Sequence, residues 1–153
     1  MSAQEAVAYA RELVQLSMER SKRGLCTWKH QGRKPFAHDC VGMVKLSCEA
    51  GGYFFKTNTR PTYGRDPWDD QLRLALRDEF GLPVLDAWRP GDIPLIRWNG
   101  GEPCHVGMLA DYWAGGLSII HSQRLDGTIE TILPGSRAGA GVLEVYRPDW
   151  GAP

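Results

Sequence analysis

The sequence lacks an excess of charge of either sign and lacks any long apolar run. Eighteen Lys and Arg residues balance eighteen Asp and Glu residues over 153 positions, and they are scattered rather than grouped. Proteins that bind a phosphate backbone or an anionic membrane carry a basic patch, so no nucleic-acid partner is expected. No apolar stretch approaches the ~18 residues of a transmembrane helix, so no membrane insertion is expected.

Residues 1–24 also lack the order of a signal peptide, in which a basic segment precedes an apolar one. We therefore expect cytoplasmic synthesis without a signal peptide. The chain shows no internal repeat, no low-complexity tract and no obvious linker. A length of 153 residues is most simply one domain, 1–153, which can bury a sizeable core.

The four cysteines form no CxxC pair. If Cys40 and Cys48 share a helix, they lie roughly 12 Å apart, too far for a disulfide, so free thiols are expected. A zinc site is conceivable, but the spacings match no common ligand pattern, and neither a metal nor a cofactor is expected. The conceivable zinc ligands are Cys26, His30, His38, Cys40, Cys104 and His105.

Helices are predicted in the first half of the chain. Ser2 and Glu5 form a capping box at the start of an amphipathic helix that ends near Gly24. A later helix is predicted from Asp66 as N-cap, with Pro67 at its first position. It ends near Gly81, and its core-facing residues are Leu72, Leu76 and Phe80.

Short β-like runs replace the helical period in the second half. They lie at 92–98, 105–113, 117–122, 128–133 and 142–147, separated by Gly, Pro, Asn or Asp. Helices followed by antiparallel strands are typical of the α+β class.

The stretch HDCVGMVKL, residues 38–46, places a thiol at a predicted helix start. Asp39 is a good N-cap, Cys40 falls in the first turn, and the pair 51–52 ends the helix. Unpaired N–H groups and the positive helix pole favour a thiolate, which lowers a cysteine pKa from ~8.5 to roughly 3.5–7.5 when a cation helps. A lone cysteine is more often a small buried apolar side chain, so a nucleophile here needs partners.

Two histidines can supply those partners. A cysteine nucleophile needs a base, and the base needs a third group that orients its ring. His105 opens a predicted strand directly after a turn, and His121 lies in the next predicted strand. Neighbouring antiparallel strands can bring these two imidazoles side by side.

Five short motifs follow one another along the chain: TWKHQG (27–32), DCVG (39–42), PGDI (90–93), HVGM (105–108) and IIHS (119–122). In these motifs the sequence resembles the NlpC-type cell-wall cysteine peptidases, and the match spans almost the whole chain. The resemblance implies a papain-like α+β fold, with N-terminal helices, an antiparallel sheet and the nucleophile at a helix N-terminus.

The resemblance also implies roles for five residues. Cys40 would be the nucleophile, His105 the general base and later acid, and His121 the polar orienter. Trp28 and Asp39 would contact the substrate. Trp28 stands where the family commonly has tyrosine.

The sequence differs from the family pattern at two further places, outside these five residues. Val41 stands where serine is common, and the segment between the two histidine strands is longer than usual. Activity is still expected, while the fine specificity is open.

The implied activity is hydrolysis of peptidoglycan stem peptides, usually at the D-glutamyl–diaminopimelyl bond. A short version without a signal peptide resembles the cell-wall peptidases of phage tails and gene transfer agents. The expected partners are then the stem peptide and phage-like tail or baseplate proteins. The enzyme would be assembled into a tail and would act in the periplasm of the target cell. Two alternatives stay open, a cell-wall amidase and a structural tail-tip protein with weak or no catalysis.

Overall fold

The computed structural model describes residues 2–57, 70–98, 100–101 and 103–151. The helices are α1 (Ala3–Lys22), α2 (Cys40–Ala50), α3 (Gln71–Phe80) and α4 (Arg137–Ala140). The strands are β1 (Arg33–Lys34), β2 (Ala37–His38), β3 (Ile93–Arg97), β4 (Pro103–Val106), β5 (Met108–Asp111), β6 (Leu117–Gln123), β7 (Gly127–Ile132) and β8 (Val142–Tyr146). This order confirms the α+β class.

The strands form two three-stranded antiparallel sheets and a short hairpin. One sheet has the order β4-β3-β8, the other β5-β6-β7, and β1 pairs with β2. The predicted strand at 105–113 is divided at Gly107, so that β4 belongs to one sheet and β5 to the other. A Cβ at Gly107 would lie 2.8 Å from the carbonyl oxygen of Ile120, so only glycine allows this close approach to β6.

Local capping signals set the helix starts. The Ser2 side chain accepts a hydrogen bond from the N–H of Glu5, as predicted, and α1 ends at Lys22. In the third helix, Asp70 is the N-cap and makes no side-chain capping bond. The predicted starting residues Asp66 and Pro67 lie outside the described residues.

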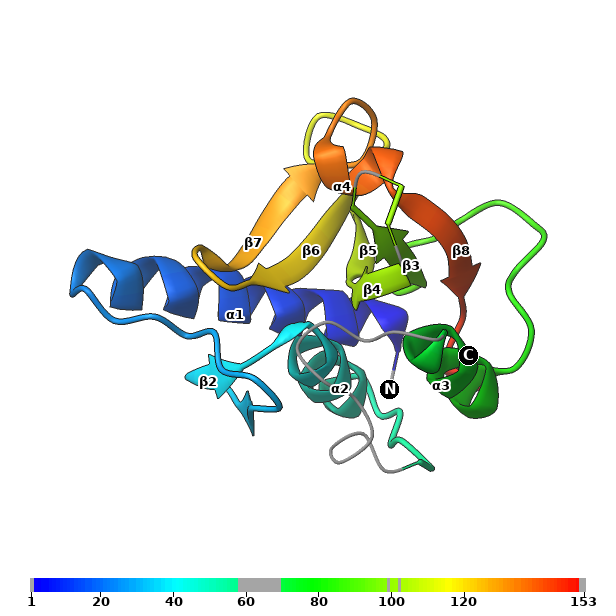
Figure 1. The fold of residues 1–153 in the computed structure, drawn as a ribbon, viewed down its shortest axis with the longest axis horizontal. Helices are drawn as coiled ribbons and strands as arrows, with labels where there is room; N and C mark the ends of the chain where they lie inside the picture. The colour runs from blue at the N-terminus through cyan, green and yellow to red at the C-terminus, as the bar shows by residue number, and fades with distance from the viewer. Residues whose placement is uncertain (1, 58–69, 99, 102, 152–153) are drawn as a thin grey trace.

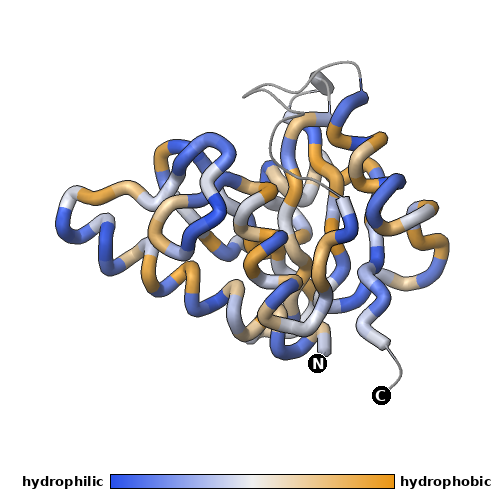
Figure 2. Tube along the Cα trace, turned by 90° about the horizontal axis from the view of Figure 1, so that it is seen from below, coloured by the Kyte–Doolittle hydropathy of each residue, from blue (hydrophilic) through white to orange (hydrophobic). Residues whose placement is uncertain are grey.

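The main core lies where α1 and α2 pack against the sheets, and α1 runs along the β5-β6-β7 sheet (Figure 1). Along the trace of α1, hydrophobic and hydrophilic residues alternate with the helical period (Figure 2). A second, smaller core cluster lies on the opposite face of the strands. It consists of Ile96, Leu109, Ile119, Ala138 and Val145.

Two local features differ from the sequence prediction. The connection at 25–37 contains the β1–β2 hairpin, and the glycine-rich turn at 134–141 contains the one-turn helix α4. Ser136 caps α4 by accepting a hydrogen bond from the N–H of Gly139. The segment before the hairpin is joined to it by a bridge between Trp28 and His38, and the N–H of Arg97 in β3 donates to the carbonyl of Gly141, directly after α4.

Candidate active site

Cys40 is the first residue of α2, as the sequence predicted. The N-cap Asp39 has an extended backbone, and its carboxylate accepts a hydrogen bond of 2.8 Å from the N–H of Gly42. The carbonyl of Asp39 accepts from the N–H of Met43 at 2.9 Å. These two bonds fix the first turn of α2 and therefore the position of the thiol.

Asp39 is itself held by the preceding chain. Its side chain is 3% exposed and accepts from the N–H of Gln31 at 2.8 Å. It also pairs with the guanidinium of Arg33 at 3.1 Å, and that side chain is buried as well. These bonds make Asp39 an anchor between the β1–β2 hairpin and α2, while its assignment to substrate binding stays a prediction.

The close packing around Gly42 explains why the DCVG motif has glycine at this position. A Cβ at Gly42 would lie 2.1 Å from the carbonyl oxygen of Gly32, and a Cβ at Gly32 would lie 2.3 Å from the carbonyl oxygen of Ala37. Both contacts are with backbone, which cannot move aside cheaply. Glycine at position 42 lets the first turn of α2 pack directly on the backbone at residue 32, and glycine at position 32 lets that backbone pack directly on β2.

His105 and His121 form a buried pair. The Nε2 atom of His105 and the Nδ1 atom of His121 are 2.8 Å apart, and the two rings meet edge to face with centroids 5.0 Å apart. His105 is 6% exposed and His121 is 1% exposed. The structure thus brings the two histidines together, as expected, but not on paired neighbouring strands, because His105 lies on β4 of one sheet and His121 on β6 of the other.

Trp98, the residue directly after β3, covers this pair and was not among the predicted site residues. Its ring centroid lies 5.2 Å from that of His105 and 6.3 Å from that of His121. The guanidinium of Arg137 stacks over the Trp98 ring, 5.3 Å from its centroid. The sequence signal for Trp98 was its place at the end of a strand, but only the strand register shows which residues it covers.

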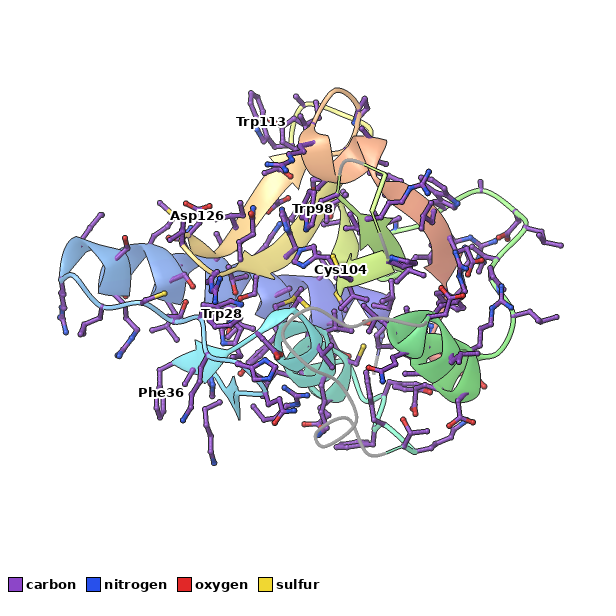
Figure 3. The ribbon with its side chains drawn as sticks, viewed as in Figure 1. Trp28, Phe36, Trp98, Cys104, Trp113 and Asp126 are labelled. Carbon is purple, nitrogen blue, oxygen red and sulfur yellow. The ribbon has the colours of Figure 1, made fainter. Side chains whose placement is uncertain are left out.

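The thiol of Cys40 meets β4 at the edge of its sheet. β4 is an edge strand, and the N–H of Val106 points to the thiol. In Figure 3, Cys104 of β4 lies toward α2, whereas Trp98 lies toward α4. Within the described residues, Cys40 makes no hydrogen bond to His105 or His121.

The acidity of Cys40 is opposite to the sequence prediction. The residue keeps some solvent exposure, but the protein atoms around its thiol raise its pKa to about 12, and the negative charge of Asp39 adds to the effect. The N–H groups of Val106 and Val41 act in the other direction and are outweighed. The predicted lowering of the pKa is therefore wrong, because burial and the anionic N-cap outweigh the helix pole.

The two histidines are neutral for the same reason. Burial lowers the pKa of His105 to about 3, and the neighbouring His121 adds to this effect. Burial lowers the pKa of His121 to about 4, with Asp126 opposing. The free site therefore holds a thiol and two neutral imidazoles at neutral pH, and not a thiolate–imidazolium pair.

Trp28 has partners of its own. Its ring stacks on His30 with centroids 6.4 Å apart, and the guanidinium of Arg124 lies 5.8 Å from the ring. Figure 3 shows it on the β2 side of the start of α2. A contact between Trp28 and a substrate stays a prediction.

The four cysteines are free. In the part of the chain that the structure describes, no three His, Cys, Asp or Glu side chains are grouped so that they could hold a metal ion. No described helix is long and apolar enough to cross a membrane.

Neither a protein-family model nor a curated protein matches this sequence. Among solved structures, the fold is similar to that of NlpC2 from Trichomonas vaginalis, with a TM-score of 0.53 and 19% sequence identity. The match covers 91% of this chain and 46% of that chain, so this chain spans about half of its structural neighbour. At this identity the likeness concerns the fold, and the fold is NlpC-like.

Proposed function

We propose that this protein is a cysteine peptidase that hydrolyses peptidoglycan stem peptides. The observation that carries the proposal is the His105–His121 hydrogen bond of 2.8 Å, buried under Trp98 beside a helix that begins with Cys40. A nucleophile, a base and an orienting group are what thiol-dependent amide hydrolysis needs. The NlpC-like fold and the five sequence motifs support a cell-wall peptide as the substrate.

The hydrogen bond between the histidines allows one productive tautomer. If Nε2–H of His105 donates to Nδ1 of His121, the Nδ1 atom of His105 keeps a lone pair that can take a proton. His121 then carries its own proton on Nε2. Donation in the other direction would leave His105 without a free acceptor, so the first arrangement is the catalytic one.

Because the free thiol and imidazole are both neutral, proton transfer accompanies the attack. The Cys40 proton moves to Nδ1 of His105 while the sulfur bonds to the amide carbonyl carbon. N–H groups at the start of α2 stabilise the oxyanion, and His121 accepts the hydrogen bond of the imidazolium. His105 then returns the proton to the leaving amine, and water hydrolyses the thioester.

The proposal includes the bond and the place of action. The sequence resemblance supports the D-glutamyl–diaminopimelyl bond, and a role in a phage-like tail that opens the wall during DNA delivery. Mass spectrometry of purified particles tests the second point. Detection of the chain in the particles supports it, and free protein in the producing cell with none in the particles opposes it.

A second candidate is a structural tail-tip protein with weak or no catalysis. The raised pKa of Cys40, together with the lack of a hydrogen bond from its thiol to His105 among the described residues, favours this candidate. It predicts a folded protein that binds wall fragments and leaves them intact.

The deciding experiment is mass spectrometry of peptidoglycan fragments incubated with the protein and with Cys40→Ala. Shortened stem peptides in the wild-type reaction alone support the peptidase. Stem peptides freed from the sugar would show an amidase instead. Unchanged fragments in both reactions would favour the structural protein. Cys26→Ser is the matched control, because this exposed thiol lies outside the site and its loss should not change the products.

A further inference from the structure

A pocket of about 260 Å³ is lined in part by His121, whose Nδ1 atom contacts His105. Its volume is several times the ~30 Å³ that one water molecule occupies in the liquid. Trp98 after β3, together with residues of β6, β7 and the segment around α4, lines it: Trp98, His121, Gln123, Thr131, Ser136, Arg137 and Ala138.

Two lining residues carry buried polar atoms that lack a partner. In the part of the chain that the structure describes, Nε2 of His121 and Oγ1 of Thr131 are buried and make no hydrogen bond. A buried polar group without a partner is unfavourable, because it has lost its hydrogen bonds to water and gained none. Since His121 is 1% exposed, bulk water does not satisfy its ring nitrogen. A bound group with oxygen acceptors would satisfy it.

The pocket offers hydrogen-bond donors and a positive charge. The tautomer that leaves His105 a base puts a proton on Nε2 of His121, so this atom donates. Arg137 stacks on Trp98 and forms no ion pair with a described residue, so its guanidinium is open to a ligand. The hydroxyl of Thr131 can donate as well.

The other polar residues of the pocket are Gln123 and Ser136. Gln123 is uncharged, and its amide can both donate and accept. Ser136 is occupied, because its hydroxyl donates to the carbonyl of Leu133 and accepts from the N–H of Gly139. No carboxylate lines the pocket within the described residues. Asp126 acts on His121 electrostatically but does not line the pocket.

From this arrangement we propose that the pocket is a subsite for a free carboxylate of the substrate, held by Arg137, His121 and Thr131. Arg binds carboxylates with two parallel N–H bonds, which gives both affinity and orientation. The identity of the carboxylate as part of a stem peptide rests on the function proposed above. Because His121 belongs to both the pocket and the catalytic pair, a carboxylate here would place the peptide relative to Cys40.

The test is a binding measurement that needs no cleavage. Isotope-labelled full-length Cys40→Ala protein is titrated with N-acetyl-D-alanine and, separately, with N-acetyl-D-alaninamide, while the imidazole and indole resonances are followed by NMR. The free acid should shift the resonances of His121 and Trp98 with saturation, and the amide should not. Arg137→Gln should weaken the binding about tenfold or more, because a charge-assisted contact is lost.

Arg124→Gln is the matched control, because Arg124 stacks on Trp28 in the same manner as Arg137 stacks on Trp98. It should leave the binding of the free acid unchanged. Three results would each overturn the subsite. They are equal shifts with the acid and the amide, no saturable shift with either compound, and binding by Arg137→Gln that is as tight as without this substitution.

Failure of the subsite and failure of the proposed function remain distinguishable. Binding of the free acid by a protein whose wild type leaves wall fragments intact would support the pocket and refute the peptidase. Cleavage of stem peptides with free and amidated carboxylates at equal kcat/KM would support the peptidase and overturn the pocket.

Discussion

Lowering the pH from about 7.5 to about 5 should destabilise this fold, because His105 and His121 are buried in their neutral forms. Burial lowers their pKa values to about 3 and about 4 from the ordinary 6.5. In the unfolded chain both imidazoles titrate near pH 6.5. Between pH 6.5 and about 4, the unfolded state therefore binds protons at these two residues and the folded state does not. The stability contributed by this pair is present above pH 6.5 and is lost as the pH falls toward 4.

The size of the loss follows from the same values. At pH 5, protonation of a histidine with a pKa of 6.5 stabilises the unfolded state by about 2 kcal/mol. The folded state stays almost unprotonated at this pH and gains almost no such stabilisation. The two histidines together give about 4 kcal/mol, a large share of the roughly 5–15 kcal/mol that stabilises a typical domain. His38 is also fully buried, and burial lowers its pKa as well, so it adds a loss in the same direction.

Urea unfolding, followed by tryptophan fluorescence at both pH values, measures this loss. The double variant His105→Gln/His121→Asn keeps polar side chains but removes both titrating groups. Wild type should lose about 4 kcal/mol more than this variant between the two pH values. His30→Asn, a histidine replacement outside the buried pair, should behave like wild type. Equal losses in wild type and the double variant would refute the neutral pair and the mechanism built on it.

Three further predictions concern the site. Alkylation of Cys40, read by mass spectrometry, should speed up about tenfold per pH unit from pH 7 to 10, because its thiol is neutral there; a plateau below pH 9 would instead indicate an ion pair with His105. In kcat on a stem peptide, His105→Ala should fall to nearly the level of Cys40→Ala, whereas His121→Asn should keep substantial activity and His121→Ala should lose much more; a fully active His121→Ala would exclude the orienting role. Gly107→Ala should cost about 1–3 kcal/mol in urea unfolding, because its Cβ would lie 2.8 Å from the Ile120 carbonyl and push β5 from β6; unchanged stability would show that the strands separate freely at this point.

Much of the site could be predicted from the sequence because its parts are local. Asp39 followed by an apolar stripe at helical spacing is sufficient to place Cys40 at the start of α2. His105 and His121 were expected on neighbouring antiparallel strands, but they lie on β4 and β6 of different sheets. Their contact of 2.8 Å therefore also depends on the strand break at Gly107. The α+β class follows in the same way from the change in hydrophobic period.

The sequence by itself therefore determined the order of the elements and the three candidate catalytic residues. Capping, periodicity and turn signals act over a few neighbouring residues, so they can be read from the sequence. Only the tertiary structure decided the protonation state of those residues. The helix pole at Cys40 is a local effect, but the thiol is buried in the folded protein beside Val106 and Cys104 of β4, far along the chain, and burial outweighs the helix pole. Trp98 and Arg137 likewise meet the histidine pair only through the strand register and α4. Desolvation depends on every element packed around a group, and no local pattern of residues encodes that.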